Sequence, residues 1–223
     1  MLILKNIIQN YKQGDEVIKV LDNLNLTLKK NKIIGLIGSS GSGKSTLLNI
    51  IGLIEIPLSG NIEINEVRCD KLDSEEKTHF RRKNIGYVFQ NNQLLEDFNC
   101  EENVALPLIL DGMSHIESIR KSRSLLKKFN LDNRRSFKPS LLSGGEQQRV
   151  AVLRALIKKP KILLADEPTG SLDKKNSLIV LEQILELVTE QNTISIIATH
   201  NLDLISYFDI CFKIEKGKLV EFK

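Results

Sequence analysis

The sequence predicts an α/β fold with three parts: a core around a parallel sheet, an N-terminal antiparallel β subdomain and an inserted helical subdomain. Leucines alternate with polar residues at 24–28, as on a half-buried strand. Apolar, β-branched runs at 33–37, 162–165 and 193–198 are typical of buried parallel strands. Residues 91–149 are instead polar and helical in tendency. We therefore expect one domain over residues 1–223.

Within that domain, residues 91–149 are expected to form the helical subdomain. Residues 1–90 and 150–223 are expected to form the core together with its β subdomain. A chain of 223 residues is long enough for one such domain with a substantial core.

The first third of the chain predicts strands on both sides of one buried helix. Lys12–Asp15 contains a Gln-Gly-Asp turn signal that would join two antiparallel strands. The apolar stretch Leu47–Ile56 predicts a buried helix. Leu58–Asn61 indicates a turn, and the alternation at 62–64 indicates a further strand.

The rest of the core follows in order. A short apolar run at 85–89 predicts a strand that ends at Gln90. Four apolar residues at helical spacing over 178–188 predict a helix between the last two buried strands. The C-terminal stretch 210–222 predicts a hairpin that turns at Lys216–Gly217.

Composition excludes several classes of protein. The formal net charge is only +4, and the basic stretch Arg81–Lys83 is typical of a solvated helix face, so we expect no nucleic-acid partner. No segment reaches the ~18 consecutive apolar residues of a membrane span, and the N-terminus does not have the pattern of a signal peptide. Cys69, Cys100 and Cys211 are widely spaced, which predicts neither disulfides nor a zinc site and indicates a reducing, cytoplasmic setting.

The nine residues after the run at 33–37 have the pattern of a phosphate-binding loop between a strand and a helix. They are Gly38, Ser39, Ser40, Gly41, Ser42, Gly43, Lys44, Ser45 and Thr46. Glycines let backbone N–H groups surround the α and β phosphates, and the helix N-terminus adds the positive end of its dipole. Lys44 is expected to reach the β and γ phosphates, and the Ser45 hydroxyl to bind Mg²⁺. The chain is therefore expected to bind ATP or GTP.

A second candidate anion-binding site lies at residues 142–149. Ser143 and Glu146 have the spacing of a capping box, which predicts a helix start. A plain capped helix needs no glycine pair, because each glycine costs about 1 kcal/mol relative to alanine. Gly144 and Gly145 would instead open the helix end to an anion. A plain capping box is the alternative if the motif is considered alone.

Two carboxylates follow the buried run at 162–165. Asp166 is expected to hold Mg²⁺ through the water shell of the ion. Glu167 is placed to act as the general base toward an attacking water. Gln90 and His200 also follow predicted strands. Taken alone, a histidine in this position is more often a satisfied core residue, and Gln90 has the same ambiguity.

Together and in this order, these motifs resemble the nucleotide-binding subunits of ABC transporters, along essentially the whole chain. The resemblance implies a P-loop NTPase (RecA-like) core and a head-to-tail homodimer with two ATP sites. The Walker A loop is 38–46, and the signature motif is 142–147, whose residues Ser143, Gly144, Gly145 and Glu146 would contact the partner's ATP.

The same resemblance assigns roles to single residues. Gln90 is the Q-loop glutamine, which contacts Mg²⁺ and the reaction centre. Asp166 ends Walker B, Glu167 is the catalytic base, and 171–173 is the D-loop. His200 is the switch histidine. Tyr11 resembles the aromatic residue that stacks on adenine, which favours ATP.

The stretches 93–108 and 166–173 resemble a narrower branch, the lipoprotein-releasing (Lol) ATPases. This resemblance implies an ATP-hydrolysing subunit that drives integral membrane permeases of LolC/LolE-like kind, and a peripheral location on the cytoplasmic face of the inner membrane. The branch also holds macrolide exporters of the MacB kind and the cell-division ATPase FtsE, which are the alternatives. A DNA-repair ATPase of the SMC kind is more remote, because the sequence between the two anion motifs contains no sustained heptads.

Overall fold

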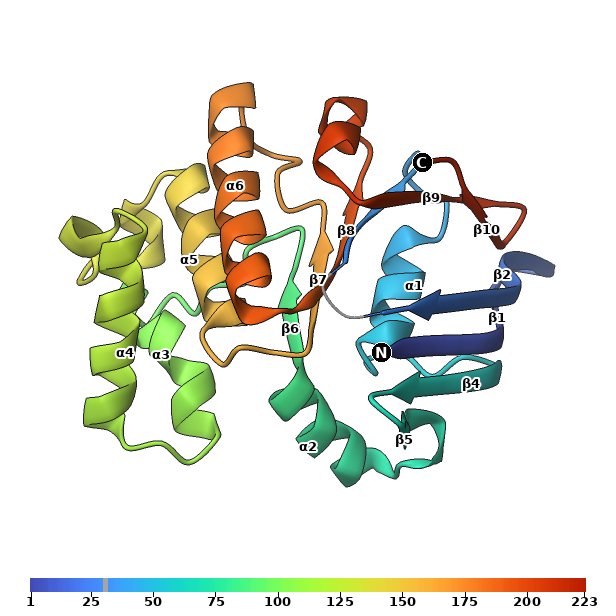
Figure 1. The fold of residues 1–223 in the computed structure, drawn as a ribbon, viewed down its shortest axis with the longest axis horizontal. Helices are drawn as coiled ribbons and strands as arrows, with labels where there is room; N and C mark the ends of the chain where they lie inside the picture. Colours follow the sequence, from blue (N-terminus) through green and yellow to red (C-terminus); the bar gives the residue numbers. More distant parts are fainter. Residues whose placement is uncertain (30–31) are drawn as a thin grey trace.

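The computed structural model describes residues 1–29 and 32–223, which form two sheets and the helices that cover them (Figure 1). A four-stranded antiparallel sheet has the order β2-β1-β4-β5, and a six-stranded sheet has the order β10-β9-β3-β8-β7-β6. The five strands from β9 to β6 are parallel, and β10 pairs with β9 in an antiparallel hairpin. The α/β fold and its N-terminal antiparallel sheet are confirmed.

The strands of the antiparallel sheet are β1 (Leu2–Gln13), β2 (Glu16–Leu28), β4 (Ser59–Ile64) and β5 (Val67–Arg68). The strands of the mixed sheet are β3 (Ile33–Ile37), β6 (Ile85–Val88), β7 (Ile162–Asp166), β8 (Ile194–Thr199), β9 (Ile210–Glu215) and β10 (Lys218–Glu221). The α-helices are α1 (Lys44–Ile51), α2 (Ser74–Asn84), α3 (Cys100–Leu110), α4 (His115–Lys128), α5 (Gly144–Leu156) and α6 (Lys174–Gln191). Short 3₁₀ turns are η1 (Cys69–Lys71), η2 (Asp132–Arg134), η3 (Pro139–Leu141) and η4 (Leu202–Tyr207).

Helix α1 lies between the two sheets (Figure 1). Its Leu47, Leu48, Ile50 and Ile51 are buried in one apolar cluster that contains residues from both sheets. Strand alternation decides the faces, since successive side chains of a strand point to opposite sides. In β7 every second residue therefore contributes to this cluster.

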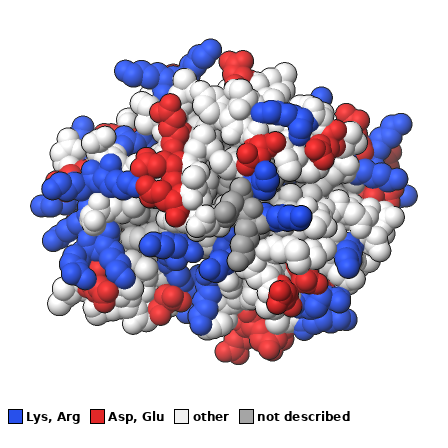
Figure 2. All heavy atoms as spheres, in the orientation of Figure 1, with Lys and Arg blue, Asp and Glu red and all other residues white. Residues whose placement is uncertain are grey.

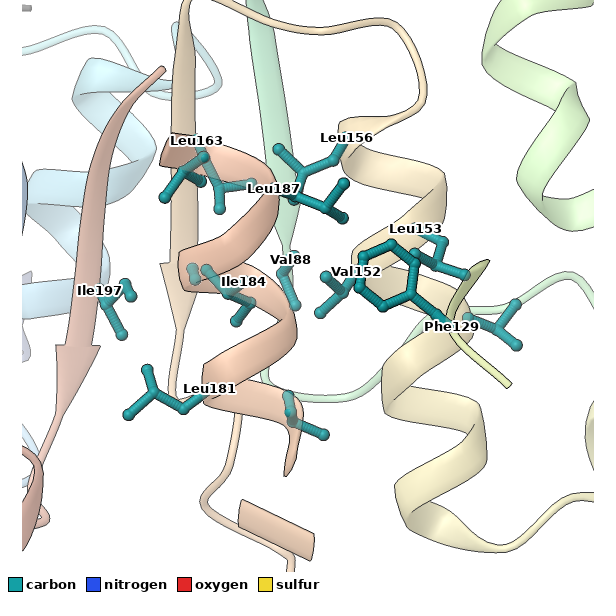
Figure 3. Close-up of a cluster of buried hydrophobic side chains, with 14 of the residues drawn as sticks. Val88, Phe129, Val152, Leu153, Leu156, Leu163, Leu181, Ile184, Leu187 and Ile197 are labelled. Atoms are coloured by element: carbon teal, nitrogen blue, oxygen red, sulfur yellow. The ribbon is translucent and has the colours of Figure 1, made fainter. Parts of the chain in front are cut away.

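The other face of the mixed sheet is covered by α5 and α6. Figure 3 shows Val152 and Leu156 of α5 packed beside Ile184 of α6, over Leu163 of β7. The same cluster includes buried residues of α3 and α4, which hold these two helices against α5. The expected helical subdomain thus corresponds to α3, α4 and the start of α5. Helix α5 continues past residue 149 into the core, and the subdomain boundary stays a prediction.

Two predictions near the end of α1 are wrong. The helix ends at Ile51 rather than Ile56, because Gly52 and the left-handed Leu53 (φ +56°) turn the chain. Leu58–Asn61 is not a turn, since Ser59 already pairs with Ile8 of β1. Gly60 makes this possible: its φ is +109°, and a side chain there would meet the Asn6 carbonyl oxygen at 2.6 Å.

The surface carries both signs of charge. Figure 2 shows Lys and Arg side chains interspersed with Asp and Glu over the face drawn in Figure 1. Over residues 1–29 and 32–223, the structure contains no helix with the length and apolarity needed to cross a bilayer. Cys69, Cys100 and Cys211 are buried free thiols. Burial raises the pKa of Cys69 and of Cys100 to about 11.

Candidate functional site

The loop between β3 and α1 has the backbone shape of an anion cradle. Gly41 and Gly43 have φ values of +78° and +97°, which residues other than glycine rarely adopt. Gly43 caps α1 without a side-chain hydrogen bond, and the first turn of the helix holds no acidic residue. The first N–H groups of α1 therefore have no side-chain acceptor, and they fit an anionic ligand.

Lys44 lies in the middle of this cradle, with a side chain only 5% exposed. Its Nζ donates to the carbonyl oxygens of Gly38 and Ser39 at 2.7 and 2.9 Å. The same ammonium lies 3.8 Å from Glu167 Oε1. The positive charge therefore lies between the loop carbonyl oxygens and the Glu167 carboxylate.

Glu167 follows β7 and reaches two neighbouring elements. Its φ is +46°, an uncommon conformation for a residue with a side chain, and its N–H donates to the Ala198 carbonyl at 2.9 Å. Oε2 accepts from the His200 backbone N–H at 3.4 Å and lies 2.9 Å from His200 Nδ1. Because β7 and β8 are parallel neighbours, the residues at their carboxyl ends meet here. The structure thus brings Lys44, Glu167 and His200 together.

Asp166, the last residue of β7, is 8% exposed. Its Oδ1 atom is buried and has no hydrogen-bond partner among the described residues. An unpaired buried carboxylate oxygen is costly, so such an atom is suited to a cationic ligand or its water. The described part of the chain holds no cluster of three or more His, Cys, Asp and Glu that could bind a metal by itself. Mg²⁺ does not require one, since one or two carboxylates and substrate phosphates suffice.

A cavity of about 720 Å³ joins these groups. Its lining contains most of the residues predicted for the site, namely Tyr11, Ser39, Ser40, Gly41, Gly43, Lys44, Ser45, Thr46, Gln90, Asp166, Glu167 and His200. Gln90 enters from the segment just after β6 and is exposed. Gly38 and Ser42 belong to the same loop but do not line the cavity.

The second predicted anion site lies elsewhere in the chain. Ser143 and Glu146 form the expected capping box at the start of α5, with Glu146 also paired to Arg134 at 2.8 Å. Ser143 and Gly144 are exposed, and none of the residues 143–146 lines the cavity. A single copy of the chain therefore does not bring its two anion motifs together.

Sequence reasoning missed two apolar residues of the cavity wall, Ile18 and Val20. The β1–β2 register places Ile18 directly opposite Tyr11. The turn signal at Lys12–Asp15 contained this information, because a tight turn at Gly14 and Asp15 fixes which residues pair across a hairpin.

Comparison with known proteins agrees with this geometry. The model of the family described as ABC transporter matches residues 21–170. The lipoprotein-releasing system ATP-binding protein LolD of Rickettsia bellii is 44% identical to this chain over 98% of it and 97% of the relative. LolD of Buchnera aphidicola is 42% identical over 98% of this chain and 96% of its own length.

A solved structure, the ATP-binding cassette MJ0796 as a dimer bound to ADP and Pi, has a TM-score of 0.92 to this chain. It is 38% identical, and the match covers 100% of this chain and 98% of that one. The family match exceeds half of the chain and the relatives match nearly all of it. This chain therefore belongs to the ABC transporter family, and it is one of the ATP-binding cassettes.

Proposed function

We propose that this chain is the ATP-hydrolysing subunit of a transporter that releases lipoproteins from the inner membrane toward the outer membrane. The observation that carries this proposal is the near full-length similarity to lipoprotein-releasing ATP-binding proteins, at 40–44% identity. The cavity at the carboxyl ends of β3, β7 and β8 supplies the chemistry that such a subunit needs.

The nucleotide lies in this cavity with its triphosphate on the loop 38–46. Lys44 neutralises the β and γ phosphates once it exchanges its contacts with Gly38 and Ser39 for phosphate oxygens. Tyr11, which also lines the cavity, provides an aromatic face for adenine.

Mg²⁺ fits the residues present. Ser45, Gln90 and Asp166 all line the cavity, and the unpaired Asp166 Oδ1 gives a negative atom that lacks a protein partner. These three residues would hold the ion, directly or through its waters. When bound, Mg²⁺ supplies positive charge that stabilises the phosphate oxygens during transfer.

Glu167 acts as the general base and accepts a proton from the water that attacks the terminal phosphate. His200 positions the carboxylate through the 2.9 Å contact to Oε2. The His200 backbone N–H also donates to Oε2, so two nitrogen atoms of this one residue contact the carboxylate.

The working unit is a homodimer in which Ser143, Gly144, Gly145 and Glu146 of one copy close the ATP cavity of the other. The exposed start of α5, remote from its own cavity, supports this arrangement. The dimeric MJ0796 cassettes support it independently.

We expect Ser143→Arg to leave ATP binding to one chain unchanged and to lower ATP hydrolysis by a hundredfold or more. An arginine at this position would be desolvated beside the partner's cavity, and a buried unpaired charge costs about 3–5 kcal/mol. Nucleotide titration would measure binding, and phosphate release would measure turnover. Ser124→Arg, at an exposed position on α4, is the matched control. Normal turnover in Ser143→Arg would contradict the two-chain site.

The permease is expected to dock at a groove of about 670 Å³ between α2, β6, α3 and the end of α5. Its wall is partly apolar, with Leu95 and Leu110 exposed at 43% and 58%, and Arg82 and Lys158 also line it. The segment after Gln90 contributes to this groove, so an occupant there would contact the loop that enters the ATP cavity. This docking would hold the chain at the cytoplasmic face of the inner membrane.

Co-purification from detergent-solubilised membranes of the source cells tests the assignment. We expect the tagged chain to recover permease subunits whose depletion stops lipoprotein release. Leu110→Asp, in the groove, is expected to lose the permease while ATP binding persists. Recovery of a macrolide exporter or a cell-division protein instead would refute the lipoprotein assignment and favour one of the alternatives.

A further inference from the structure

We propose that Glu55 is a positioning residue for the adenine end of the site, because it anchors the hydroxyl group of Tyr11. This inference rests on the proposed role of Tyr11 as the adenine platform. It adds a residue outside the motifs discussed above, on the segment that links α1 to β4.

The contacts of Glu55 converge on Tyr11. The Tyr11 hydroxyl donates to Glu55 Oε1 at 2.5 Å, and it lies 3.3 Å from Thr46 Oγ1. The same Oε1 accepts from Gln9 Nε2 at 2.7 Å. Gln9 is only 6% exposed, and its own Oε1 accepts from the Leu58 backbone N–H at 3.0 Å. Glu55 thus binds Tyr11 directly, and Gln9 links the same carboxylate oxygen to the Leu58 backbone.

The backbone of the segment directs Glu55 inward. Its N–H and that of Ile54 both donate to the Asn49 carbonyl of α1, at 3.2 and 2.9 Å. Ile54 and Ile56 are 49% and 72% exposed, while the carboxylate between them faces the protein. An arrangement that exposes two isoleucines and directs a carboxylate inward is unusual for a surface segment, since apolar side chains normally take the inner positions.

The network matters because Tyr11 lies near the tip of a hairpin and is 40% exposed. Without its anchor the ring would sample several orientations, and ATP would have to order it on binding. Burial and the Glu55 hydrogen bond both raise the pKa of Tyr11 above its ordinary value, which is consistent with the hydroxyl donating to the Glu55 carboxylate. The Tyr11 ring is therefore set in place before the nucleotide arrives.

The test compares ATP with inorganic tripolyphosphate, which has the phosphates but no base. We expect Glu55→Ala and Tyr11→Phe each to weaken ATP binding by about three- to tenfold, the loss expected when a ligand must order one side chain. Neither variant should change tripolyphosphate affinity. Because both remove the same contact, the double variant should bind ATP no more weakly than either single one. Glu55→Gln retains an acceptor oxygen and should restore most of the affinity.

Controls separate the possible failures. Glu75→Ala, on the exposed face of α2, should leave both affinities unchanged. Equal weakening of tripolyphosphate in Glu55→Ala would indicate a purely structural role and overturn the inference. If Tyr11→Ala weakens ATP binding but Glu55→Ala does not, the inference alone fails. If Tyr11→Ala leaves ATP affinity unchanged, the platform role itself is wrong.

Discussion

Glu167→Gln is expected to lower ATP hydrolysis by about a hundredfold to ten-thousandfold, the usual contribution of a positioned general base. The amide has nearly the same shape, so it can still accept from the His200 backbone N–H, but it cannot take a proton from water. ATP binding should persist. The two-chain state should then accumulate, because closure is no longer followed by cleavage.

Phosphate release and size-exclusion chromatography with ATP would measure these two effects on the same sample. Glu182→Gln makes the same chemical change at an exposed position on α6 and should behave as the unmodified chain. Undiminished phosphate release by Glu167→Gln would show that another group serves as the base.

Lys44→Ala should act one step earlier and weaken ATP binding itself by about a hundredfold or more. Removing one partner of a desolvated charge pair across a binding interface costs about 2–5 kcal/mol, and the Lys44 side chain, 5% exposed, would form such a pair with the phosphates. The variant would also lack the cation that faces the β and γ phosphates. Nucleotide titration by calorimetry would measure the loss.

The exposed Lys127→Ala on α4 is the matched control for that measurement. Unaltered ATP affinity in Lys44→Ala would contradict the placement of the triphosphate on loop 38–46. Together, the two lysine variants distinguish a local electrostatic role from a general effect of lost positive charge.

Much of the site was predictable because it depends on local rules. A glycine-rich loop between a strand and a helix indicates a phosphate cradle, and parallel strands bring their carboxyl ends to one edge. Asp166 ends β7, Glu167 follows it and His200 follows the neighbouring strand β8, so the fold class predicts that these residues lie close together.

The prediction failed where contacts between distant segments decide the structure. The apolar run after Ile51 resembles the continuation of a helix. Local periodicity does not reveal that side chains of β1 bind the Glu55 carboxylate. Glu55 meets Gln9 and Tyr11, which lie 46 and 44 positions earlier in the chain. Gly60 likewise permits the pairing of β4 with β1, which a turn pattern in the local sequence does not predict.

The position of α1 between the two sheets has a thermodynamic consequence. The cavity is lined by residues of both sheets and by the start of α1, whose buried face contacts both. Ligand occupancy is therefore linked to the unfolding equilibrium of the two sheets as one cooperative unit. Helices α3 and α4 pack in the other cluster and do not line the cavity. Nucleotide therefore stabilises these two helices only indirectly, through the mixed-sheet residues that share their cluster.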